Sequence, residues 1–215
     1  MITPKAIQNW QKKWRRSVAI RKFEENTLGN VSFYTLIFAG GVIGSAGLIQ
    51  GNEAVVIGAM LITPLVTPLS GIALGLTMQN TQTLSWAVVR SFLGISLLFV
   101  LSYIIGEYFW DGVTNQSLDA RSNDRNILDV FIAIAAGIVA ALALASEKIH
   151  SHLSGAAIAL SLAPPLSVAA LWLAKGNFNA FYNASTLFLL NVGGIISMGI
   201  VIFIIFGFRR DNAEA

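Results

Sequence analysis

Two proline-containing segments of the sequence hold the residues that could do chemistry in an apolar environment. One is VIGAMLITPLVTPLSG, with Pro64 and Pro68, and the other is GAAIALSLAPPLSVAALWLAKG, with Pro164 and Pro165. A proline inside a helix lacks an amide hydrogen and leaves a carbonyl oxygen unpaired, which a bound solute or ion could use. Hydroxyl groups that could join it come from Thr63, Thr67, Ser70, Ser161 and Ser167. The segments therefore predict either a solute or ion path or two kinks whose free groups are met by Ser and Thr.

Arg90 and Asn191 are each the one strongly polar residue of an otherwise apolar run. They lie 101 positions apart, close to the offset of 100 between Pro64 and Pro164. Arg90 can extend to lipid headgroups from a helix end, or it can face the interior of a helix bundle and attract an anion. We include both polar residues in the expected path.

The motifs of common enzyme active sites are absent from the sequence. It contains no HExxH, GxSxG, P-loop or dinucleotide-binding pattern, and it has no cysteine. His150 and His152 form an HxH pair near Glu147, but no third ligand of suitable spacing accompanies them. We interpret the pair as part of a solvated loop. The sequence thus predicts no enzyme activity, no metal site and no cofactor.

The composition indicates the kind of molecule that must position these groups. Of the 215 residues, 55% are hydrophobic and 12% are charged, and the mean hydropathy is +0.68. A soluble domain carries about 25% charged residues, so the sequence predicts an integral membrane protein. The net charge of +3 does not indicate nucleic-acid binding, because seven basic residues cluster in residues 1–30 beside the first apolar run.

The apolar runs predict an all-α polytopic membrane protein with six transmembrane helices. A helix needs about 20 largely apolar residues to cross a bilayer, and six stretches have that length: 31–50, 54–78, 85–109, 127–146, 153–174 and 183–207. Eleven of the fourteen Lys and Arg then fall on the side of the two termini. The positive-inside rule places that side, including the tail 209–215, in the cytoplasm of a prokaryotic cell.

The N-terminal segment, residues 1–30, is basic and amphipathic. Apolar residues recur at helical spacing within 4–28, while other faces carry the basic residues Lys12, Lys13, Arg15 and Arg16. This pattern favours a helix lying on the cytoplasmic leaflet and attracted by anionic lipid. The alternative is a gate or a docking element for a partner protein.

The six expected spans divide into two similar halves, about 31–109 and 127–207. The run GGVIGSAG from Gly40 resembles AGIVAALA from Ala136 at an offset of 96, near the offsets of the prolines and polar residues. Three spans per half reverse the second copy in the membrane, which gives the inverted 3+3 repeat known from secondary transporters. Small residues four apart, such as Gly40 and Gly44, predict close helix packing. We also expect a homo-oligomer, because six short spans make a slim bundle.

The order of these motifs resembles a bacterial and archaeal membrane family, domain of unknown function 389. The resemblance extends over about residues 30–208 and includes the runs VIGAMLITPLVTPLSG, LSLAPPLSVAAL and FLLNVGGIIS. Its characteristic positions here are Gly58, Ala59, Met60, Pro64, Pro68, Gly71, Pro164, Pro165 and Asn191. The resemblance supports the fold and leaves the function open. From the residues we expect a transporter or channel for a small solute or ion, and the alternative is a non-transporting membrane scaffold or assembly subunit.

Overall fold

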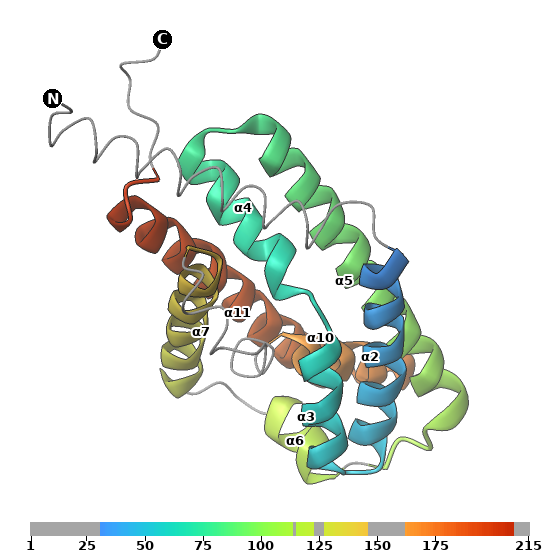
Figure 1. The fold of residues 1–215 in the computed structure, drawn as a ribbon. Coiled ribbons are helices and arrows are strands. Elements are labelled where there is room, and N and C mark those ends of the chain that lie inside the picture. Colours follow the sequence, from blue (N-terminus) through green and yellow to red (C-terminus); the bar gives the residue numbers. More distant parts are fainter. Residues whose placement is uncertain (1–30, 114, 123–126, 146–161, 209–215) are drawn as a thin grey trace, which may run out of the picture.

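The computed structural model describes residues 31–113, 115–122, 127–145 and 162–208. Every regular element within these ranges is an α-helix (Figure 1). The helices are α2 (Val31–Ile49), α3 (Glu53–Ile62), α4 (Val66–Met78), α5 (Thr81–Phe109), α6 (Gln116–Ser122), α7 (Ile127–Ala145), α10 (Ala163–Ala174) and α11 (Phe178–Ile205). The expected all-helical fold is therefore confirmed for the described residues.

Three described helices, α2, α5 and α11, are long and apolar enough to cross a membrane. Up to five spans result if each bent pair counts as one: α3 with α4, bent by 46°, and α6 with α7, bent by 91°. Helix α10 has 12 residues, and the part of the expected span 153–174 that precedes residue 162 lies outside the described residues. The short helix α6 falls in a region that we expected to be a loop.

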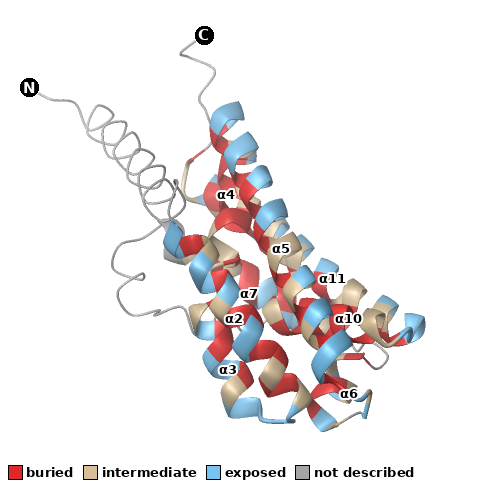
Figure 2. Cartoon of the chain, turned by 90° about the vertical axis from the view of Figure 1, so that its right-hand side faces the viewer, coloured by how far each residue is buried: buried red, intermediate tan, exposed pale blue. Residues whose placement is uncertain are grey.

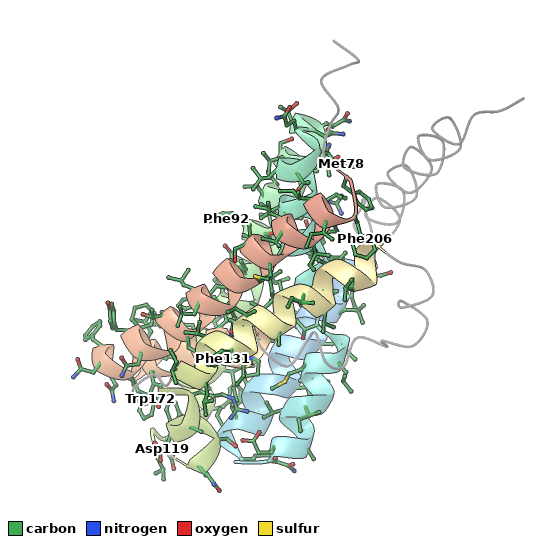
Figure 3. All side chains as sticks on the ribbon, turned by 90° about the vertical axis from the view of Figure 1, so that its left-hand side faces the viewer. Met78, Phe92, Asp119, Phe131, Trp172 and Phe206 are labelled. Atoms are coloured by element: carbon green, nitrogen blue, oxygen red, sulfur yellow. The ribbon has the colours of Figure 1, made fainter. Side chains whose placement is uncertain are left out.

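The outer surfaces of these helices are apolar. Figure 2 shows exposed positions along the outward faces of the helices, and large hydrophobic residues are among them. Phe92 on α5 and Phe131 on α7, both labelled in Figure 3, are 68% and 62% exposed. Apolar surface on this scale is compatible with a membrane protein, because lipid rather than water can cover it.

A tight turn joins α4 to α5. Gln79 adopts a left-handed conformation with φ of 52°, and the amide of Asn80 donates to the carbonyl of Gly75 at 3.0 Å. The Asn80 side chain then caps α5 by accepting a hydrogen bond from the amide of Thr83 at 3.1 Å. One asparagine therefore ends one helix and begins the next.

The turn between α10 and α11 has the same design 97 positions later. Gly176 takes the left-handed conformation, with φ of 69°, and the amide of Asn177 donates to the carbonyl of Trp172 at 3.0 Å. The Asn177 side chain accepts from the amide of Ala180 at 3.1 Å. The two long helices α5 and α11 thus begin in equivalent ways.

Small residues allow close helix contacts in both parts of the chain. A Cβ atom on Gly44 of α2 would lie 3.3 Å from the Cβ of Ala59 on α3. A Cβ atom on Gly194 of α11 would lie 2.6 Å from the carbonyl oxygen of Ala133 on α7. The packing role expected for the small-residue stripes is confirmed at these contacts.

Candidate functional site

The segment Thr63–Leu65 separates α3 from α4, and Figure 1 shows it as an extended link. The hydroxyl of Thr63 donates to the carbonyl of Ala59 at 2.8 Å, and the Thr63 amide donates to the carbonyl of Met60 at 3.3 Å. Two carbonyls left over at the end of α3 are thereby satisfied. The hydroxyl of Thr63 also fills the space where a side chain on Gly40 would lie, so α2 packs directly on the break.

The other three prolines lie in the first turns of described helices. Pro68 is the third residue of α4, and Pro164 and Pro165 are the second and third residues of α10. Amides of a first turn have no partner inside their own helix, so these prolines free no carbonyl within a continuous helix. They mark helix starts, and Pro64 alone of the four lies in a break between two described helices.

The helix boundaries also correct the register between the two proline segments. Helix α10 begins at Ala163, 97 positions after α4 begins at Val66. At this offset Pro68 corresponds to Pro165, whereas Pro64 has no proline counterpart at residue 161. This register differs by three positions from the expected pairing of Pro64 with Pro164, because a repeated proline in each segment offers more than one alignment.

The two proline segments meet around a small cavity of about 10 Å³. Its lining residues are Gly40, Gly44, Leu48, Val56, Ala59, Met60, Ala163, Pro164 and Ser167. A cavity of this size has room for about one water molecule. Residues about 100 positions apart in the sequence thus line one small space, and we name it the central cavity.

A chain of buried hydroxyls adjoins the central cavity. Ser45 on α2 donates to Ser102 on α5 at 2.9 Å, and Ser102 donates to Ser167 on α10 at 2.9 Å. All three side chains are buried, and Ser167 also lines the cavity. Sequence reasoning identified Ser167 but missed Ser45 and Ser102. Both serines lie on the small-residue stripe of their helix, and this sequence pattern could have identified them.

Ser70 is the counterpart of Ser167 at the offset of 97, but its surroundings differ. Its hydroxyl oxygen is buried and has no hydrogen-bond partner among the described residues. At the same offset Gly199 takes the place of Ser102, and glycine offers no hydroxyl. The second helix crossing therefore lacks the hydrogen bond that the first one has.

Arg90 and Asn191 lie on the buried faces of α5 and α11, but neither lines the central cavity. Arg90 is 7% exposed, and its guanidinium lies 5.7 Å from the centre of the Trp86 ring. At the offset of 97, Asn191 corresponds to Gly94 rather than to Arg90. This register differs by one helical turn from the expected pairing of Arg90 with Asn191. Thr67 is half-buried and does not line the cavity either.

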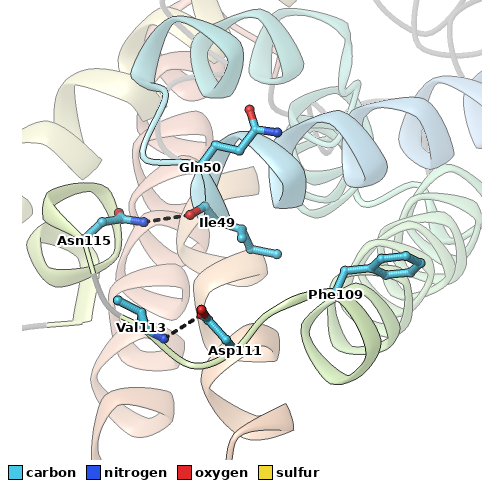
Figure 4. A pocket seen from close by; sticks show the side chains of 6 residues that line it. All are labelled: Ile49, Gln50, Phe109, Asp111, Val113 and Asn115. Carbon is cyan, nitrogen blue, oxygen red and sulfur yellow. Dashed lines mark hydrogen bonds between the residues drawn. The ribbon is translucent and has the colours of Figure 1, made fainter.

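A second and more open hollow lies at the end of the molecule where α2 and α5 terminate. It has a volume of about 390 Å³ and is lined by Ile49, Gln50, Phe109, Asp111, Val113 and Asn115 (Figure 4). The Asn115 amide nitrogen donates to the carbonyls of Leu48 at 2.9 Å and Ile49 at 3.1 Å. The loop after α5 thus satisfies the last carbonyls of α2.

Several predicted residues lie outside the described ranges. They are Ser161, His150, His152 and the basic residues Lys12, Lys13, Arg15 and Arg16. Within the described ranges, no group of three His, Cys, Asp or Glu could hold a metal ion.

Comparison with known proteins gives a family but no activity. The chain is 29% identical over 166 residues to an uncharacterised protein of Methanocaldococcus jannaschii, with 77% of this chain and 51% of that protein covered. It thus spans about half the length of the curated relative it matches. No solved structure was found to match the chain. The family described as "Domain of unknown function (DUF389)" matches residues 60–197, which include the starts of α4 and α10 and the cavity-lining residues Met60, Ala163, Pro164 and Ser167. The chain belongs to this family, domain of unknown function 389.

Proposed function

We propose that the chain is a six-span membrane protein built as an inverted 3+3 repeat, with both termini in the cytoplasm. The pattern of contacts between helices supports the repeat. The pattern stays the same when α2 is exchanged with α7, α4 with α10 and α5 with α11. Helix α4 packs on α5 as α10 packs on α11, and α10 packs on α5 as α4 packs on α11. Likewise α2 packs on α5 and α10, as α7 packs on α11 and α4.

The burial pattern supports the same repeat. All seven buried positions of α11 fall on buried positions of α5 when shifted by 97, as in Ala184 with Ala87 and Ile195 with Leu98. Two helices that use the same face at the same register are expected in equivalent places of a duplicated unit.

The function that the geometry supports best is transport or channel conduction of a small solute or ion. One observation carries this proposal: the last turn of α3, just before the helix break, and the first turn of α10 both line the central cavity. Inverted-repeat transporters place their solute sites where discontinuous helices of the two halves meet. The Ser167 hydroxyl is the polar side-chain group among the residues that line the cavity.

At about 10 Å³ the cavity is too small for a solute, so conduction requires the helices to separate there. The same tight packing favours the second candidate, a membrane scaffold or assembly subunit in which the prolines only shape helices. We retain a homo-oligomer as part of either proposal, since exposed apolar faces on α5 and α7 could contact lipid or another copy.

The test uses the absence of cysteine from the chain. The Ser167→Cys protein is reconstituted into liposomes, and flux of a panel of small anions and cations is measured before and after treatment with a small methanethiosulfonate reagent. We expect modification to abolish the flux, because the added group fills the cavity. The matched control is Phe92→Cys, whose side chain faces outward, and there the flux should persist.

Two results would contradict transport through this cavity. Flux that never exceeds that of empty liposomes for any solute favours the scaffold function. Flux that survives complete modification of Ser167→Cys places the path elsewhere in the molecule.

A further inference from the structure

Helix α6 lies at the end of the molecule where α2 meets α3 (Figure 1). Its one large apolar residue, Leu118, is 0% exposed and belongs to a packed cluster with Leu48, Val56 and Met60. These three partners also line the central cavity. A single leucine from α6 therefore supports the cavity wall on this side.

Polar contacts hold α6 against the start of α3. The two guanidinium nitrogens Nη1 and Nη2 of Arg121 each donate to one carboxylate oxygen of Glu53, both at 3.0 Å. The hydroxyl of Ser117 donates to the same carboxylate at 2.5 Å, and Nη1 of Arg121 also donates to the Ser117 carbonyl at 2.7 Å. We name the group Glu53, Ser117 and Arg121 the latch.

The latch lies where solvent can weaken it. The side chain of Glu53 is 49% exposed and that of Arg121 is 20% exposed, and exposed ion pairs are weakened by salt. A helix of seven residues is too short to be stable alone. Beyond the latch, the Asn183 amide nitrogen donates to the Ser122 carbonyl at 3.1 Å. Helix α6 also packs against α2, α10 and α11, and the latch is its solvent-exposed attachment to α3.

We propose that α6 is the gate of the path at this end, with Leu118 as its plug and the latch as the device that keeps it closed. That the gate controls a transport path rests on the proposed function. The gate itself concerns access to the central cavity, which can be measured without any flux.

The experiment follows the reaction of a cysteine placed in the cavity. Ser167→Cys protein in lipid nanodiscs, where both ends are open to solvent, is treated with a hydrophilic maleimide, and the rate of labelling is measured by mass. Adding Glu53→Gln removes the charge of the latch, and adding Leu118→Ala removes the plug without touching the charges. We expect each change to raise the labelling rate about fivefold.

Three controls separate gating from unfolding. The exchange of Glu53→Arg with Arg121→Glu restores an ion pair and should return the rate to within about twofold of the original. Labelling of Thr77→Cys, a buried position on α4, should not respond to the latch changes. Raising the salt from about 0.1 M to about 1 M should speed the labelling of Ser167→Cys when Glu53 is present and have no effect with Glu53→Gln.

Unchanged labelling of Ser167→Cys in both the Glu53→Gln and the Leu118→Ala proteins would overturn the gate. Equal acceleration at Thr77→Cys would also overturn it, because the whole bundle would then have loosened. Faster labelling without measurable flux supports the gate and counts against transport. Measurable flux with unchanged labelling supports transport and counts against the gate.

Discussion

At the scale of single residues, the contact between Gly40 and Thr63 decides how closely α2 approaches the helix break. The Thr63 hydroxyl occupies the place of a Gly40 side chain while it bonds the carbonyl of Ala59. The sequence could indicate that Gly40 packs and that Thr63 supplies a hydroxyl. It could not show that the two meet, because that contact depends on the angle between α2 and α3.

We expect Gly40→Ala to lower the free energy of unfolding by about 2 kcal/mol, because the new methyl group must displace the Thr63 hydroxyl. Thr63→Ala should cost about 1 kcal/mol through the lost hydrogen bond. The double variant should cost less than the sum, since the clashing atom is gone. Unfolding in mixed micelles measures all three.

Gly58→Ala is the matched control on the neighbouring helix. A Cβ atom there would meet nothing within 4 Å, so stability should be unchanged or rise by up to about 1 kcal/mol. Equal losses for Gly40→Ala and Gly58→Ala would show that the Thr63 contact does not limit the packing.

At the scale of elements, the prolines and asparagines mark helix boundaries. Pro68 and Pro165 occupy the third position of α4 and α10, and Asn80 and Asn177 cap the helices that follow. The sequence predicted helices over most of the described residues, but it placed α3 and α4 in one span and missed α6. It predicted an interior kink at Pro68, which lies in the first turn of α4, because a continuous apolar run gives no sign of where a first turn begins. Asparagine between two apolar runs was the unused signal.

Replacing Asn80 or Asn177 by Ala should each lower the free energy of unfolding by about 1 kcal/mol, the usual cost of losing a helix cap. Because the two turns have the same geometry, the losses should be similar, and because they are separate they should add in the double variant. Gln82→Ala, an exposed change in the first turn of α5, serves as the control. A loss at only one of the two asparagines would contradict the equivalence of the turns.

At the scale of the whole molecule, the two proline segments both contribute to the lining of the central cavity. Neither composition nor hydropathy could locate the central cavity, since it arises from contacts between segments about 100 residues apart. The internal similarity of the sequence did indicate that corresponding segments exist. It gave offsets between 96 and 101, and the starts of α4 and α10 and of α5 and α11 both differ by 97. The central cavity, the serine chain (Ser45, Ser102 and Ser167) and helix α6 could be identified only from the structure.

A pair of cysteines across the central cavity tests this arrangement in the full chain. Ala59→Cys and Ala163→Cys line the same small space, so a short bifunctional thiol reagent should join them efficiently, as detected by mass spectrometry of the linked peptides. Gly58→Cys, one position away and exposed, should give little linkage to Ala163→Cys. Equal yields for the two pairs would mean that the segments do not meet as described.

The serine chain has a further consequence for a molecule made of two equivalent halves. Inverted repeats switch between opposite orientations by exchanging the conformations of their halves. Here the α5–α10 crossing has the Ser102–Ser167 hydrogen bond, and the equivalent α11–α4 crossing has Gly199 and Ser70 instead. One hydrogen bond of about 1 kcal/mol corresponds to about a fivefold difference in population. Under the proposed inverted repeat, the duplication would make two orientations equal in energy, and glycine in place of serine at residue 199 would favour one of them.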